Sequence, residues 1–195
     1  MRKEDAFTLT ETARRLGVPQ HRLIHLCEKE AVIPDLGDAS GRGSSRLFSR
    51  RNLLEFAVAL RLRDMMLPVA AIRALLYVLR AFEARLTRDL PGFALPDSLR
   101  DPGAPDLRIV VADGRTIFFS LGRSGEKAKV FGGVPLAPLM EEEATRGGAG
   151  SGRVRFPKAV RQGQGTIGLE APEGGRFGRL ELSVTAIARD LPLDG

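Results

Sequence analysis

Tryptophan is absent from this sequence of 195 residues, and Cys27 is its one cysteine. A single thiol cannot form an internal disulfide, which is typical of proteins in a reducing compartment. Residues 1–5 are not followed by an apolar segment, and no run reaches the roughly 18 apolar residues that a membrane span needs. We therefore expect a cytoplasmic protein without a signal peptide or a membrane span.

The second half of the chain lacks the side chains of common catalytic sites. Residues 93–195 contain no His, Cys, Trp or Tyr, which excludes Ser-His and Cys-His nucleophile systems there. Both histidines, His21 and His25, lie four residues apart, a spacing that can hold zinc, but no acidic pair or cysteine completes a site. We therefore predict that the protein is not an enzyme and that it uses neither a metal nor a cofactor.

Positive charge is concentrated in the first half. The chain has a net charge of +6; residues 1–92 carry 16 basic and 11 acidic residues, whereas residues 93–195 carry 14 and 13. A basic excess favours an anionic partner such as nucleic acid or an acidic membrane surface. Residues 91–105 are rich in Pro, Gly and Asp, and we predict that they form a linker between two parts of different composition.

The first part has the pattern of short helices. Thr8-Leu9-Thr10-Glu11 fits a capping box, in which the Thr8 hydroxyl accepts from a helical amide and Glu11 reaches back. The helix is predicted to end at Gly17, because a tight helix exit favours positive φ. A second helix is predicted from Pro19 to about Glu30, so that the two form a helix-turn-helix unit.

The stretch Gly41–Arg51 (GRGSSRLFSRR) holds three features in sequence. Residues 41–45 are rich in glycine and serine, and residues 46–48 follow with a basic and two apolar side chains. Ser49 can cap a third helix, which carries apolar residues at helical spacing. No Gly-Lys-Ser/Thr follows the glycines, so the stretch is not a phosphate-binding loop of the P-loop type.

A fourth helix is predicted from Val69 to Arg88, after a break at Leu67-Pro68. Its apolar stripe extends beyond what the core of a small domain needs, which suggests a dimer interface. The alternative is that the second domain packs on the stripe. The stripe consists of Ile72, Leu75, Leu76, Leu79, Phe82 and Leu86.

The second part is predicted to be rich in β-strands. Residues 107–121 hold two β-rich runs joined at Asp113-Gly114, a strong hairpin signal. Further strands are expected at 128–131, 154–156, 166–169 and 180–187, and a glycine-rich loop at 146–152. The sequence thus predicts an α+β protein with a helix-turn-helix domain at 1–67, a dimerisation helix at 68–90, a linker at 91–105 and a β-rich domain at 106–195.

Taken in order, the first 80 residues resemble the MerR family of transcription regulators. The resemblance rests on residues 8–18 (TLTETARRLGV), a basic second helix, residues 46–54 (RLFSRRNLL) and the helix pair broken at Leu67-Pro68. It implies a winged helix-turn-helix, a dimerisation helix and a variable C-terminal effector domain. In the wing, residues 41–45 would form the turn and residues 46–48 the returning strand, with Phe48 packed inward. It also implies binding to pseudo-palindromic promoters and action on RNA polymerase.

The sequence departs from the family at two places. Ile24-His25-Leu26 stand in the middle of the second helix, where the family has an arginine and aromatic residues. Ser44-Ser45-Arg46 stand where the wing of the family has Gly-Tyr-Arg.

The candidate DNA contacts lie on the second helix and in the wing. A helix in the major groove reads base edges mainly with its N-terminal half, and flanking cations meet phosphates. The candidates are Gln20, His21, Arg22, His25 and Lys29 on the helix, and Arg42, Ser44 and Arg46 in the wing.

Together these features predict a homodimeric, sequence-specific regulator that binds double-stranded DNA and whose C-terminal domain binds a small molecule or a protein. The alternative is a structural or assembly adaptor, or a recombination accessory protein, whose C-terminal domain docks a protein partner. A promoter-sized footprint favours the first hypothesis, and a stoichiometric protein partner without specific DNA favours the second.

Overall fold

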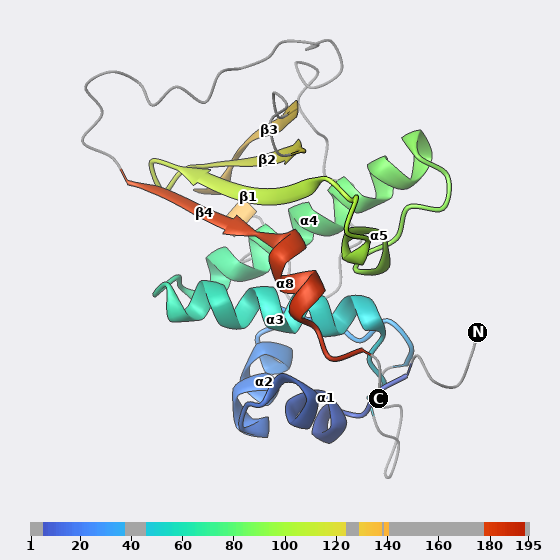
Figure 1. Cartoon of the computed structure of the whole chain (residues 1–195). Helices are drawn as coiled ribbons and strands as arrows, with labels where there is room; N and C mark the ends of the chain where they lie inside the picture. Colours follow the sequence, from blue (N-terminus) through green and yellow to red (C-terminus); the bar gives the residue numbers. More distant parts are fainter. Residues whose placement is uncertain (1–5, 38–45, 124–128, 138, 141–177, 194–195) are drawn as a thin grey trace. The chain divides into compact units, whose positions relative to one another are not determined.

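The computed structural model describes residues 6–37, 46–123, 129–137, 139–140 and 178–193 (Figure 1). They form helices and one antiparallel sheet, which confirms the predicted α+β class. The chain divides into two units: residues 1–98 together with 187–195, and residues 99–186. The second unit is therefore inserted into the first along the chain, whereas the sequence predicted a second domain that continues to the C-terminus.

The first unit begins with α1 (Leu9–Leu16) and α2 (Gln20–Glu28). The Thr8 hydroxyl accepts from the Glu11 amide at 3.2 Å, as predicted, but the Glu11 carboxylate pairs with arginines of the next turn. Gly17 has φ 63° and ψ 33°, the left-handed conformation expected at this helix exit. The second helix ends at Glu28, two residues before the predicted end.

Two longer helices, α3 (Arg50–Asp64) and α4 (Val69–Asp89), complete the helical part of the first unit (Figure 1). Ser49 caps α3 in a capping box with Asn52, and the chain breaks between the helices at Leu67-Pro68, both as predicted. Phe48 is fully buried and packs edge-on against Phe56 with 5.2 Å between the ring centroids. This contact fixes the strand before α3 on the core.

The apolar stripe of α4 is buried within a single chain. The exposed fractions of its side chains lie between 0 and 6%, for Ile72, Leu75, Leu76, Leu79, Phe82 and Leu86. A dimer interface made by these side chains would require them to leave this packing. Homodimerisation therefore stays a prediction, without an exposed stripe on α4 to support it.

Two segments of the first unit pair on either side of residues 38–45. Phe7 and Phe48 exchange two backbone hydrogen bonds of 2.9 Å, and Leu47 pairs with the Leu36–Gly37 backbone in antiparallel fashion. We call residues 33–37 and 46–49 the paired segments. The predicted wing turn, with Arg42 and Ser44, lies outside the described residues.

The second unit contains a four-stranded antiparallel sheet of order β3-β2-β1-β4. Its strands are β1 (Asp106–Ala112), β2 (Thr116–Gly122), β3 (Lys129–Pro135) and β4 (Arg179–Ser183). The predicted hairpin at Asp113-Gly114 is confirmed, and both residues have positive φ. Ile109 lies opposite Phe119 on β2 and Leu182 on β4, so an apolar row crosses the sheet.

The structure corrects two predictions near the junctions. The strand expected at 180–187 ends at Ser183, whose hydroxyl accepts from the Ala186 amide and thereby caps α8 (Val184–Asp190). Residues 91–105 contain a short helix, α5 (Asp97–Arg100), and buried Leu95 and Leu99, so they are not a simple linker. The strands and loop expected between 146 and 169 lie outside the described residues.

No helix within the described ranges is both long and apolar enough to cross a membrane.

Candidate nucleic-acid interface

The outer face of α2 carries the predicted base-reading residues. The helix buries Leu23, Leu26 and Cys27, which leaves the opposite side to solvent because side chains recur every 3.6 residues. Gln20, His21, Ile24, Glu28 and Lys29 are exposed, and Arg22 and His25 are partly exposed. The structure thus brings all five α2 candidates to one outer surface of the helix, with Ile24 and Glu28 among them.

Arg22 is engaged by the end of α3. Its Nη2 lies 2.9 Å from the carboxylate of Asp64, and the two side chains are 39% and 55% exposed. Exposed ion pairs of this kind contribute about 0–1 kcal/mol, so a phosphate or a base edge can compete for the guanidinium. The pair also shows that the last turn of α3 lies beside α2.

Two arginines near that turn were missed by the sequence analysis. Arg61 and Arg63 are exposed, whereas Leu60 and Leu62 beside them are buried. Their alternation with leucine was available in the sequence, but only the Arg22–Asp64 pair shows that this end of α3 adjoins α2. They add two exposed positive charges to the end of α3 whose Asp64 contacts α2.

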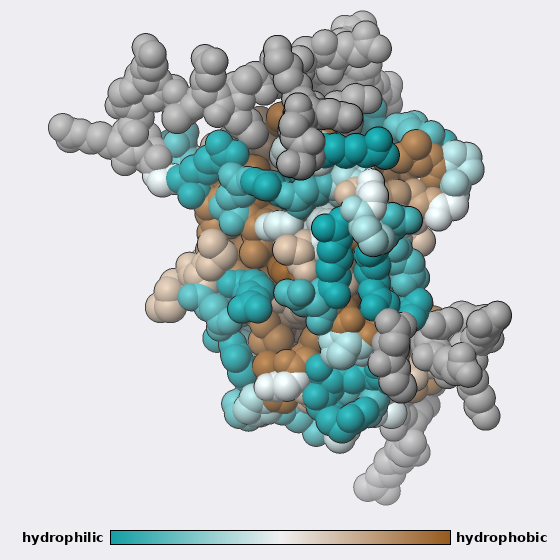
Figure 2. Space-filling view, in the orientation of Figure 1, coloured by the Kyte–Doolittle hydropathy of each residue, from teal (hydrophilic) through white to brown (hydrophobic). Residues whose placement is uncertain are grey.

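The neighbouring helix α1 also has a polar outer surface. Hydrophilic residues gather over α1 in the view of Figure 2. Arg14 and Arg15 both pair with the Glu11 carboxylate, and the Thr10 hydroxyl donates to Gln20 Oε1 at 3.3 Å. This hydrogen bond joins the first residue of α2 to α1 and restrains the side chain of Gln20.

Arg46 lies beside the C-terminal half of α2. Burial raises the pKa of the Cys27 thiol to about 11, and the charge of Arg46 and its hydrogen bond to the thiol oppose this rise. Arg46 is exposed at the same time, so it stands at the surface where the second paired segment meets α2. The sequence predicted an outward-facing Arg46, and the structure adds its contact with α2.

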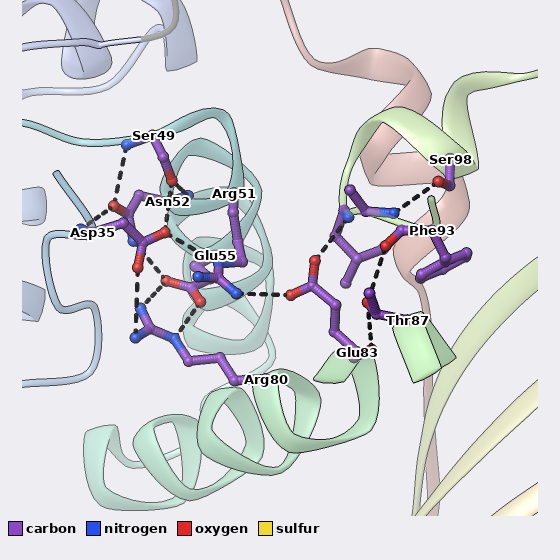
Figure 3. A network of polar contacts seen from close by, with 12 residues as sticks. Asp35, Ser49, Arg51, Asn52, Glu55, Arg80, Glu83, Thr87, Phe93 and Ser98 are labelled. Carbon is purple, nitrogen blue, oxygen red and sulfur yellow. Dashed lines mark hydrogen bonds and ion pairs between the residues drawn. The ribbon is translucent and has the colours of Figure 1, made fainter. Parts of the chain in front are cut away.

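A buried amide holds both paired segments on α3 (Figure 3). Asn52 Oδ1 accepts from the backbone amides of Asp35 at 2.9 Å and Ser49 at 3.2 Å. Its Nδ2 donates to the carbonyl of Ile33 at 2.9 Å and to the Glu55 carboxylate. One side chain therefore ties the segment before residues 38–45 to the segment after them.

A buried ion pair reinforces this attachment. Glu55 is 1% exposed, and both of its carboxylate oxygens accept from the Arg80 guanidinium of α4. Burial raises the pKa of Glu55, against the opposing effects of Arg80 and Asn52. Arg80 also donates to the carbonyl of Ile33 at 3.0 Å, so that α4 supports the first paired segment directly.

The network continues away from the paired segments along α4. Arg51 bridges the carboxylates of Asp35 at 3.1 Å and Glu83 at 3.0 Å. Glu83 accepts in turn from the backbone amide of Leu95 at 2.8 Å (Figure 3). These groups are paired with one another, so the network works as a support that positions the surface around α2.

In the part of the chain that the structure describes, no three His, Cys, Asp or Glu side chains gather as a metal site would require. Comparison of the chain with protein-family models and with curated proteins finds no match. A functional assignment therefore rests on the residues and their geometry.

Proposed function

We propose that the protein is a MerR-type transcription regulator that binds double-stranded DNA through α1, α2 and the paired segments. In this proposal α1 and α2 form a helix-turn-helix, and the paired segments belong to its wing. The observation that carries the proposal is the outer face of α2, which is largely polar and has the exposed Arg46 beside its C-terminal half. The order of motifs in residues 7–80 supports the family assignment.

The dimensions of α2 suit the major groove. An α-helix with its side chains is about 10–12 Å in diameter, and the major groove is about 12 Å wide, so a helix such as α2 fits into it. Gln20 and His21 stand exposed at its N-terminal end, where recognition helices contact base edges. Lys29, Arg61 and Arg63 are suited to phosphates, which position the protein without reading sequence.

The remaining elements of the proposal concern assembly and regulation. We propose a homodimer on a pseudo-palindromic promoter, action through RNA polymerase, and a small-molecule or protein ligand for the second unit. Analytical ultracentrifugation of the full chain tests the dimer, with sedimentation as a monomer at micromolar concentration as the contrary result.

The central experiment is selection of duplexes from a randomised library with the full chain, followed by fluorescence anisotropy as a function of salt. A dimer that neutralises six to ten phosphates should lose about 10³–10⁵ in affinity between 50 and 200 mM salt. A flat salt response would contradict the proposal. No enriched duplex, together with a stoichiometric protein partner, would favour the adaptor hypothesis instead.

Two variants separate positioning from base reading. Arg46→Ala should weaken binding to all duplexes alike, because a phosphate contact carries no sequence information, whereas His21→Ala should change the base preference. Arg108→Ala is the matched control, since Arg108 is an exposed arginine on the sheet of the second unit and should leave binding unchanged. A change of preference with Arg46→Ala would show that the wing is misplaced.

A further inference from the structure

Ile24 is an apolar residue on the polar face of α2. Its side chain is 38% exposed, although an isoleucine is usually placed in the core. The structure describes four other exposed large apolar side chains, and all of them lie outside the helices: Ile33, Met65, Met66 and Leu90. Of the five exposed large apolar side chains that the structure describes, Ile24 is therefore the one that lies within a helix.

The surroundings of Ile24 exclude a role in the core. The positions of α2 that face the interior are filled by Leu23, Leu26 and Cys27. The neighbours of Ile24 on the helix surface are Gln20 one turn before and Glu28 one turn after, and both are exposed. Ile24 is therefore an apolar spot within an otherwise polar surface, in the middle of the helix.

One base offers a matching group in the major groove. Base pairs show hydrogen-bond donors and acceptors there, and thymine adds its C5-methyl group. An apolar side chain gains by covering a methyl group and gains nothing from an unpaired donor or acceptor. We propose that Ile24 contacts the C5-methyl group of a thymine and so makes one position of each half-site specific for T, an inference that rests on the DNA-binding function proposed above.

Removal of that methyl group alone provides a direct test. Deoxyuridine pairs like thymidine but lacks the methyl group, so the same duplex can be compared with and without the contact. Burial of one methyl-sized group corresponds to about a fourfold change in affinity. We therefore expect about a fourfold loss of affinity when dU replaces one particular dT. When that position is changed to cytosine, 5-methylcytosine should bind more tightly than cytosine, because it restores the methyl group.

The experiment uses the full chain and the duplexes recovered by selection, with each dT replaced in turn by dU. The wild type should lose affinity at one dT of each half-site, and Ile24→Ala should bind the dT and dU duplexes equally. Leu90→Ala is the matched control, because Leu90 is an exposed leucine outside α2 and should retain the wild-type response to dU. Thermal unfolding confirms that both variants are folded.

The outcomes separate the two proposals. If no duplex binds, the proposed function and this inference both fail. If a preferred duplex is recovered but no dU replacement weakens binding, DNA binding stands and the role of Ile24 is refuted. The same holds if Ile24→Ala remains as sensitive to dU as the wild type.

Discussion

Replacement of Arg80 by alanine should destabilise the first unit much more than the loss of an exposed arginine. Arg80 holds both oxygens of Glu55, and it donates to the carbonyl of Ile33. In Arg80→Ala the Glu55 carboxylate keeps a single described bond, from Asn52 Nδ2. A charge that is 1% exposed would then lack its counter-ion.

The expected cost follows from the burial of this pair. Breaking a buried ion pair by removing one partner costs about 3–5 kcal/mol, because the remaining charge stays desolvated. The Arg80 side chain is 27% exposed, so water can enter the space that it leaves, and the lower end of the range, about 3 kcal/mol, is expected. For a chain of this length that corresponds to a melting temperature lower by about 6–12 °C.

The assay can report on the first unit alone. Tyr77 is the single tyrosine of the chain and lies in α4, so its fluorescence follows the unfolding of the helices around it. Urea titrations of Arg80→Ala and wild type at pH 7 give the difference in unfolding free energy. Arg85→Ala is the control in the same helix: its ion pair with Asp89 joins side chains that are 30% and 65% exposed, and its loss should cost about 0–1 kcal/mol.

The pH dependence has a defined sign. Burial raises the folded-state pKa of Glu55 above its ordinary value, and loss of Arg80 removes an opposing effect. A raised folded pKa gives stability that is present below the unfolded pKa and lost as pH rises through the folded pKa. The loss of unfolding free energy in Arg80→Ala should therefore become smaller as the pH falls from 7 toward the pKa of an ordinary glutamate.

A double variant completes the test. Glu55→Gln with Arg80→Ala removes the buried charge and leaves an amide oxygen for Asn52, so it should recover most of the lost stability. A cost of Arg80→Ala no greater than that of the Arg85→Ala control would refute this prediction, as would a double variant no more stable than Arg80→Ala.

Two further predictions concern the helix pair. Gly17→Ala should cost about 1–2 kcal/mol in unfolding free energy, because φ is 63° while the added Cβ would meet nothing within 4 Å, so the backbone conformation is the whole penalty. A gain in stability, as Gly→Ala gives inside an exposed helix, would contradict the left-handed exit. Alkylation of Cys27 in the folded protein should reach half its maximal rate near pH 11, and near pH 9 in the urea-unfolded chain. The reason is that the thiolate is the reactive form and burial raises the pKa of the thiol. A midpoint near pH 9 in the folded protein would show that the thiol is solvated.

Local features could be predicted from the sequence because each depends on a few neighbouring residues. The Thr8 and Ser49 caps and the Gly17 exit each involve a bond or a backbone angle within about four positions. The Asp113-Gly114 hairpin needs only two residues of positive φ between two β-rich runs. The outer face of α2 followed from helical periodicity in the same way.

Charged residues of the core could not be assigned from periodicity. Glu55 and Arg80 lie 25 positions apart on different helices, so nothing near either one shows that it is buried and paired. Arg22 and Asp64 are 42 positions apart, and their contact alone places the end of α3 beside α2. The stripe of α4 was recognised as apolar, but an apolar stripe does not specify what covers it.

Backbone preferences and residue spacing over short distances were enough to predict the caps of α1 and α3, the turn between α1 and α2, the hairpin and the polar side chains on the outer face of α2. They did not predict α5, α8 or the end of α2 at Glu28. Only the tertiary structure decided that residues 187–195 return to the first unit, that Asn52 and Arg80 hold the paired segments, and that Ile24 stands exposed among polar neighbours. These features depend on contacts between residues that are far apart in the sequence. The free energy of such contacts comes from burial and pairing, which a local sequence pattern does not show.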